Sequence, residues 1–390
     1  MLKSDVIKKI EELRTKGAVF VSTQYNQYII KKETAVNYEV GRMEWFDGCS
    51  GLVWYGDIVS VTDKKPLVYD ETNGITVGSD PELFFVNDKG NVVPSNLVVP
   101  SNTAFEDVIR DGFQGELNPK SSSCRQTAGS NIAHAFLRAV RYAKDVGATV
   151  SLKVGHVITD DVWETTPRGM RRFGCNPTLN VHETNFKRVT GSRERFRAAG
   201  GHVHLGLPNK CKVDLAKVVA LMDIYAGNTC VLIDRDPDNA RRRKNYGRAG
   251  EHRVKTYGVE YRVLSNFWLR SYTLWSMVSV LCRNAVDIHY IGYADELLGR
   301  FDMKKVRKAI NDNDFELAKE NFEILRTFIK EHQITGSGLD VTRVDKFYNW
   351  ATAKEDPLTS WNTLDKTIRS WKSKTMTNGM GFEAFIHRKK

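Results

Sequence analysis

Four short segments carry acidic, amide, imidazole or guanidinium side chains spaced two residues apart. The pairs are Asp80 and Glu82 in SDPEL, Gln114 and Glu116 in FQGELNP, His202 and His204 in GGHVHLG, and Glu260 and Arg262 in VEYRV. The rest of each segment is mostly apolar or glycine, which predicts a strand, and residues i and i+2 of a strand point to one face. We therefore expect one sheet to present these polar side chains on one face and to rest on a core with the other.

This grouping predicts a metal site. If Asp80, Glu82, Glu116 and Glu260 converge, four carboxylates share one cleft, where they cannot all stay ionised without cations. Oxygen ligands with one imidazole favour hard ions, so magnesium or manganese is expected rather than zinc. Each pattern alone is more often a solvated strand face, an ordinary pair of histidines or a surface ion pair. The period that all four share favours a common site.

Positive charge is concentrated in one part of the chain. The sequence has 58 Lys+Arg against 47 Asp+Glu, a formal net charge of +11, and between Lys187 and Lys255 the counts are 16 and 7. The densest part is RRRKNYGRAGEHR, residues 241–253. Arg248 and Arg253 precede the Glu260 segment, where they suit bidentate binding of phosphate or carboxylate. Nucleic acid is the alternative anionic partner, and it is not the favoured one.

Composition excludes several classes of protein. Of the 390 residues, 41% are hydrophobic and 27% charged, which is typical of a folded globular chain. There is no apolar run of about 18 residues, so no membrane partner is expected. The charged start of the sequence lacks the features of a secretory signal, and the six cysteines are far apart without a CxxC pair. These features predict a cytoplasmic location.

The order of the segments predicts an α+β fold with three parts. Residues 1–70 read as a small α+β appendage of unknown role, with a helix at 3–16 and β-rich pieces after it. Residues 75–294 alternate strands with helices, including helices near 130–143 and 215–234, and form the expected catalytic domain. Residues 295–390 read as a helical region packed on that domain. The sheet is expected to be mixed or antiparallel, with helices on one face.

These motifs also resemble a known superfamily. GSDPELFF resembles the first metal-binding strand of the glutamine synthetase and glutamate–cysteine ligase superfamily, GGHVHLG its glycine–histidine strand, and YGVEYRVLSNFW its late Glu-x-Arg strand. With FGCNP between them, the set is most similar to the phage and bacterial amidoligases of the carboxylate–amine ligase type 2 family. The resemblance runs from about Ile75 to Ala294 and implies a glutamine-synthetase-like fold.

The resemblance implies ATP-dependent amide formation through an acyl phosphate, with two magnesium (or manganese) ions. Its partners would be a small-molecule or peptide carboxylate and an amine, in the host cytoplasm if the chain is phage-encoded. By position, Asp80, His202 and Glu260 would hold one ion near the nucleotide, and Glu82 and Glu116 the other near the substrates. Asp111 is a further candidate ligand, although its spacing from Glu116 differs from that in better-known ligases.

The resemblance also assigns the cations. Arg248, Arg253 and Arg262 would act in catalysis by contacting phosphate groups or the acyl phosphate. Arg248, Arg253 and His204 would bind the nucleotide. The sequence has no GxxxxGK[ST] loop, so a P-loop is not the ATP site.

Other functions stay open at this point. A guanidino-kinase-like phosphotransferase would use a related fold and an arginine-lined site. An HxH pair also occurs in metal-dependent hydrolases, and Cys175 could be a nucleophile beside His182 or His202. A basic nucleic-acid-binding protein is the non-enzymatic alternative. The bases of the nucleic acid would stack on aromatic residues of the appendage, namely Tyr25, Tyr28, Trp45, Trp54 and Tyr55.

Overall fold

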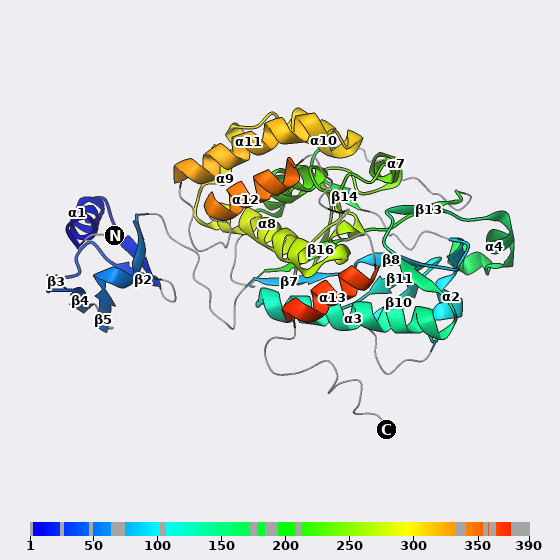
Figure 1. Cartoon of the computed structure of the whole chain (residues 1–390). Coiled ribbons are helices and arrows are strands. Elements are labelled where there is room, and N and C mark those ends of the chain that lie inside the picture. The colour runs from blue at the N-terminus through cyan, green and yellow to red at the C-terminus, as the bar shows by residue number, and fades with distance from the viewer. Residues whose placement is uncertain are drawn as a thin grey trace, which may run out of the picture. The chain divides into compact units, whose positions relative to one another are not determined.

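The chain divides into two compact units. A computed structural model describes residues 3–23, 27–46, 50–63, 75–101, 107–171, 178–183, 194–207, 213–332, 341–353, 358 and 364–375. One unit comprises residues 1–70 with 287–296, and the other comprises residues 71–286 with 297–390. All strand pairs among the described residues are antiparallel (Figure 1). The predicted α+β class with an antiparallel arrangement is confirmed.

The first unit packs one helix on two three-stranded sheets, with strand orders β2-β1-β6 and β3-β4-β5. The helical spacing at the start of the chain forms α1, whose Val6 and Ile10 are fully buried in the core of this unit. Trp45 and Tyr55 are buried in the same core, so they are not available to stack on bases, whereas Trp54 is half exposed. Tyr25 and the side chain of Tyr28 lie outside the described residues. The elements are α1 (Lys3–Arg14), β1 (Val19–Thr23), β2 (Gln27–Ile30), β3 (Val36–Tyr38), β4 (Arg42–Phe46), β5 (Ser50–Trp54) and β6 (Ile58–Thr62).

The second unit contains two five-stranded sheets, not the one sheet that the sequence predicts. The first has the order β14-β17-β18-β16-β7, and the second has the order β10-β11-β8-β12 with β9 paired to β8. The strands of the first are β7 (Thr76–Ser79), β14 (Leu179–Asn180), β16 (Val203–Gly206), β17 (Glu251–Lys255) and β18 (Gly258–Tyr261). Those of the second are β8 (Glu82–Val86), β9 (Val92–Val93), β10 (Val108–Asp111), β11 (Gln114–Leu117) and β12 (Thr149–Ser151). A separate pair joins β13 (Gly155–Val157) to β15 (Phe196–Ala198).

The chain passes from one sheet to the other at Asp80–Pro81, inside the segment predicted as a single strand. Pro81 has no N–H to continue a ladder. Its carbonyl instead accepts a hydrogen bond from Leu117 N (2.9 Å), and Glu82 N donates to Gly200 O (2.8 Å). These bonds tie the end of one sheet to the start of the other. Asp80 and Glu82 therefore belong to different sheets.

Helices cover the sheets of this unit. Helix α3 contacts β10, β11 and β12, and α13 lies alongside α3 (Figure 1). The predicted helix near 130–143 is confirmed, and the described residues of the region 295–390 are mostly helical, as predicted. The helices that follow α1 in the chain are α2 (Ser95–Val98), α3 (Arg125–Asp145), α4 (Asp160–Thr165), α5 (Leu215–Met222), α6 (Thr229–Val231), α7 (Asp238–Asn245), α8 (Tyr272–Tyr290), α9 (Ala294–Gly299), α10 (Met303–Asp312), α11 (Phe315–His332), α12 (Val341–Ala351) and α13 (Leu364–Thr375). No helix in the described ranges is both long and apolar enough to cross a bilayer.

The helix predicted at 215–234 forms with an interruption. Asp214 caps α5 by accepting a hydrogen bond from Lys217 N (3.0 Å), and a π-helical turn, Asp223–Asn228, then joins α5 to α6. The turn is entirely buried, and it brings Asp223 beneath β18, where Tyr261 donates a hydrogen bond to it (2.7 Å). A π-turn of this kind re-aims side chains that a regular α-helix would place elsewhere.

Gly201 packs closely against Ser265 and Trp268, and a substitution there tests this contact. A Cβ there would lie 2.1 Å from Ser265 O and 2.6 Å from Trp268 Nε1, and the first of these is backbone that cannot swing away. We expect Gly201→Ala to lower the free energy of unfolding by about 3 kcal/mol or more. Gly169→Ala, whose Cβ would meet nothing within 4 Å, is the control and should change stability little. Urea denaturation of both variants measures the difference, and equal stabilities would contradict the packing described here.

Candidate active site

Two groups of metal-ligating side chains form where the two sheets meet. The first comprises Asp80, His202 and Glu260, and the second comprises Glu82, Asp111 and Glu116. Within each group the potential ligand atoms all lie within 4.8 Å of one another. We call them the Glu260 cluster and the Glu116 cluster. The structure thus brings together every carboxylate that the sequence predicts, but in two groups of three residues.

The Glu260 cluster is assembled by strand register. His204 lies opposite Glu260 in the β16–β18 pair, and His202 and Asp80 directly precede and follow paired strands. His202 Nδ1 lies 3.1 Å from Asp80 Oδ1 and 3.8 Å from Glu260 Oε1. The imidazole packs against Gly200, where a Cβ would come within 2.4 Å of Nε2. Glycine is therefore needed there for the ring to occupy this position.

The Glu116 cluster is assembled in the other sheet. Glu82 and Glu116 are directly opposite in the β8–β11 pair, and Asp111 ends the neighbouring strand β10. One oxygen of Glu82, Oε2, accepts hydrogen bonds from Gln114 Nε2 (2.8 Å), Gly200 N (2.8 Å) and the Tyr246 hydroxyl (3.0 Å). These donors fix the orientation of the Glu82 carboxylate. Asp111, uncertain from its spacing, is placed by the structure beside the other two acids.

The two clusters differ in how their charge is balanced. Burial, followed by repulsion from the neighbouring carboxylates, raises the pKa of Glu116 to about 9 and that of Asp111 to about 7. Burial opposes ionisation in the Glu260 cluster too, but His202 and His204 hold the pKa of Asp80 well below its usual range. His202, Lys255 and Arg262 likewise lower the pKa of Glu260 against burial and the charge of Asp80. Cationic side chains therefore lie beside the Glu260 cluster, whereas the pKa values of Asp111 and Glu116 in the other cluster are raised.

Three cations surround Glu260, whose side chain is fully buried. Lys255 Nζ lies 2.8 Å from Oε2, while Arg262 and Arg253 lie 3.2 and 3.3 Å from Oε1. Arg262 is buried, whereas Lys255 and Arg253 remain partly exposed. Arg253 and Arg262 were predicted from the sequence, but Lys255 was not. The two-residue period that links Arg253 to Lys255 on β17 was the signal that would have identified it.

His204 connects the cluster to the tip of the β17–β18 hairpin. Its Nε2 lies 3.0 Å from Asp80 Oδ2, and its Nδ1 lies 2.6 Å from the hydroxyl of Tyr257. His204 therefore orients Asp80 in this structure, and Tyr257 orients His204. Sequence reasoning missed Tyr257 because a single tyrosine at a turn has no distinguishing pattern.

The remaining predicted residues lie elsewhere. Arg248 pairs with Glu183 (3.0 Å), which also binds Arg307 (2.9 Å), so its predicted contact with phosphate stays a prediction. His182 pairs with buried Asp223 (2.7 Å), the residue that Tyr261 binds on the face of β18 opposite Glu260. His182 is thus on the other side of the sheet from His202. Cys175 and the FGCNP motif lie outside the described residues.

The donor sets fit hard divalent cations. The Glu116 cluster offers only carboxylate oxygens, and the Glu260 cluster offers two carboxylates with one imidazole nitrogen. Magnesium and manganese prefer such ligands, whereas structural zinc is usually held by thiolates and several imidazoles. Three acids that share a site, Glu82 buried and Asp111 and Glu116 half-buried, also need a positive charge to stay ionised together.

Comparison with known proteins agrees with the motifs. Residues 176–292 match the family model described as "Phage phiEco32-like COOH.NH2 ligase-type 2". The predicted resemblance to this family is confirmed for that segment. It contains His202, Arg253, Glu260 and Arg262, whereas the Asp80–Glu82 motif and the Glu116 strand precede it. No curated protein matches the sequence.

Several solved structures are similar to the chain at low scores. One, entitled "Apo GmaS without ligand", is 9% identical with a TM-score of 0.31, and the match covers 77% of this chain and 68% of that one. A bifunctional glutathione synthetase from Pasteurella multocida is 10% identical with a TM-score of 0.30, covering 77% of this chain and 56% of the other. A "GmaS/ADP complex-Conformation 1" is 8% identical with a TM-score of 0.29, covering 77% and 69%.

The raised pKa values predict a link between pH and stability. In the metal-free protein, folding raises the pKa of Glu116 from 4.5 to about 9. The neutral form of Glu116 is therefore compatible with the folded state, and the ionised form destabilises it. The free energy of unfolding is highest below about pH 4.5 and falls as the pH rises towards 9. Magnesium should restore stability, and more so at about pH 8 than at about pH 6. Melting temperatures with magnesium or with a chelator, at both pH values, measure this.

Glu116→Gln isolates the responsible group. We expect this variant to raise the free energy of unfolding of the metal-free protein at about pH 8 by about 2 kcal/mol and to reduce the stabilisation by magnesium. Glu320→Gln, an exposed position on α11, is the control and should leave both unchanged. An equal response to magnesium in Glu116→Gln and the wild-type chain would show that Glu116 holds no ion.

Proposed function

We propose that this protein is an ATP-dependent ligase that joins a carboxylate to an amine through an acyl phosphate, using two magnesium ions. The observation that carries the proposal is the pair of acidic clusters at the junction of two sheets, one of them ringed by cations. The match of residues 176–292 to a carboxylate–amine ligase family supports the reaction class. The proposal extends this class to ATP, two ions and named residues.

The chain's own residues would divide the work between the two clusters. Asp80, His202 and Glu260 would hold one ion, and Glu82, Asp111 and Glu116 the other. Bound divalent ions neutralise phosphate oxygens and align the attacking and leaving groups of phosphoryl transfer. The hydrogen bonds to Glu82 Oε2 keep its carboxylate fixed, which leaves the other oxygen for a ligand.

The proposed reaction has two steps. An oxygen of the substrate carboxylate forms a bond to the γ-phosphorus of ATP while the bond to the β,γ-bridging oxygen breaks, which gives an acyl phosphate and ADP. The amine nitrogen then forms a bond to the acyl carbon, phosphate leaves, and the nitrogen loses a proton. Arg253, Lys255 and Arg262 would stabilise the negative charge on the phosphoryl oxygens, where fixed cations act most strongly.

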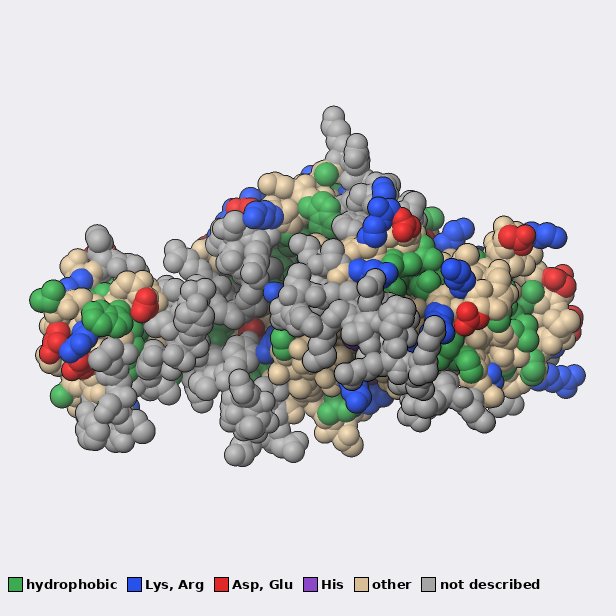
Figure 2. All heavy atoms as spheres, turned by 60° about the horizontal axis from the view of Figure 1, so that its bottom comes forward, with side chains coloured by type: hydrophobic (Ala, Val, Ile, Leu, Met, Phe, Trp, Pro, Cys, Tyr) green, Lys and Arg blue, Asp and Glu red, His purple; other side chains and the backbone are tan. Residues whose placement is uncertain are grey.

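Nucleic-acid binding has less support, because much of the basic segment is used inside the fold. Arg242 is fully buried and donates to the carbonyls of Arg262, Val263 and Leu264, and Arg243 is buried as well. Arg253 and Lys255 face Glu260. On the face shown in Figure 2, the coloured lysine and arginine side chains lie singly or in small groups, several of them beside acidic side chains.

The central experiment measures phosphate release from ATP with magnesium, using mixtures of amino acids, polyamines and peptides. We expect release that needs both a carboxylate and an amine, and a loss of at least about a hundredfold in Glu82→Gln. Asp312→Asn, at the exposed end of α10, is the control and should retain activity. Turnover that survives in Glu82→Gln, or phosphate transfer to a guanidino compound instead, would overturn the proposal.

Lys255 tests the cation ring separately. A charge-assisted hydrogen bond contributes about 1.5–3 kcal/mol, so Lys255→Met should raise the KM for magnesium-ATP by about tenfold or more. The affinity of the variant for manganese alone, measured by paramagnetic relaxation, should not fall. Lys255 pairs with Glu260 and so competes with the ion for that carboxylate. Lys308→Met, an exposed lysine on α10, is the matched control. An unchanged KM for ATP would show that Lys255 serves only to neutralise Glu260.

A further inference from the structure

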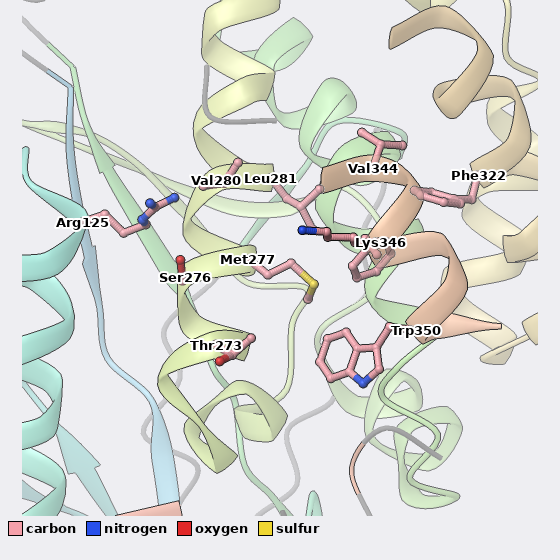
Figure 3. Close-up of a pocket in the computed structure, with 11 residues that line it drawn as sticks. Arg125, Thr273, Ser276, Met277, Val280, Leu281, Phe322, Val344, Lys346 and Trp350 are labelled. Carbon is pink, nitrogen blue, oxygen red and sulfur yellow. The ribbon is translucent and has the colours of Figure 1, made fainter. Parts of the chain in front are cut away.

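A cavity of about 450 Å³ lies among helices α3, α8, α11 and α12. Its apolar wall is built from side chains of α8, α11 and α12, and Figure 3 shows side chains of α8 and α12 converging on one space. None of its described lining residues belongs to the Glu260 or Glu116 cluster. The wall includes Met277, Val280, Leu281, Phe322, Phe347 and Trp350.

The size of this cavity is that of a ligand site. Small-molecule sites have volumes of about 300–1,000 Å³ and are lined mainly by apolar and aromatic side chains with a few polar groups. The cavity fits this description in both volume and lining.

The charges at the cavity have one sign. Arg125 and Lys346 are the charged residues among its described lining, and both are cations. Arg125 is also the first residue of α3, a helix of 21 residues, whose N-terminal end adds positive partial charge. The nearby acid Asp345 is engaged by Arg326 (2.8 Å) and Lys330 (3.1 Å) and does not line the cavity. An apolar space with cations at its border is complementary to an amphipathic anion.

We propose that this cavity binds a small amphipathic carboxylate, with the carboxylate between Arg125 and Lys346 and an apolar chain or ring against Met277 and Trp350. Burying the apolar part supplies affinity at about 25 cal/mol per Å² of surface. The two cations select an anionic head over a neutral or cationic one. The proposal is independent of the ligase function, because the cavity shares no residue with either cluster.

Calorimetric titration of the full chain with decanoate tests the proposal. Decanoate should bind once per chain, and decanol and decyltrimethylammonium should bind at least about tenfold more weakly. The double variant Arg125→Met with Lys346→Met should lose about tenfold or more in affinity for decanoate while binding decanol as before. Lys308→Met is the matched control and should bind decanoate like the wild-type chain.

A filled cavity gives the second readout. Met277→Trp should abolish binding of decanoate and decanol alike, and Val280→Phe replaces it if circular dichroism shows that Met277→Trp is unfolded. No binding of decanoate at millimolar concentration overturns the proposal. So does equal affinity for decyltrimethylammonium, or decanoate affinity that is unchanged in the double variant or in a folded cavity-filling variant.

Discussion

Repulsion among buried carboxylates is the constraint on which this site depends. Five acids meet in two clusters, and each would be unstable as an isolated buried charge. The surroundings of the two clusters differ. Guanidinium, ammonium and imidazole groups lie around Glu260, whereas burial and the neighbouring carboxylates raise the pKa of Glu116. Acids with raised pKa values favour a bound cation, because the cation would stabilise their ionised form.

The junction of two sheets makes this arrangement attainable. In one continuous strand, Asp80 and Glu82 would point to the same face of the same sheet. Because the strand breaks at Pro81, Asp80 follows a strand of one sheet and Glu82 begins a strand of the other. Gly200 is central to the junction. It accepts from Glu82 N, donates to the Glu82 carboxylate, and leaves room for the His202 ring. One glycine thereby couples the backbone of both sheets to ligands of both clusters.

The sequence predicted the identities of the site residues better than their geometry. The two-residue period identified Asp80, Glu82, Glu116, His202 and Glu260, because side-chain alternation is a local property of a strand. It could not show that the strand breaks at Pro81, since which sheet a strand joins depends on partners distant in sequence. Long amphipathic helices such as α3 and α11 were predictable from their periodicity for the same local reason. Asp111 and Tyr257 reach the site only through tertiary structure, and the buried role of Arg242 was hidden within a run of basic residues that looked exposed.

The β17–β18 hairpin cannot gain or lose a residue without displacing the cations that face Glu260. Arg253 and Lys255 point at Glu260 because each strand alternates in step with the other, and Gly258, which begins β18 opposite Lys255, has a φ of +149°. Inserting or deleting a single residue in either strand would turn the cations to the opposite face and bring His252 and Val254 beside the carboxylate. The spacing of this hairpin therefore constrains the chain as strictly as the identity of its charged residues, and any related chain that keeps the cation ring must also keep the count of residues between Arg253 and Glu260.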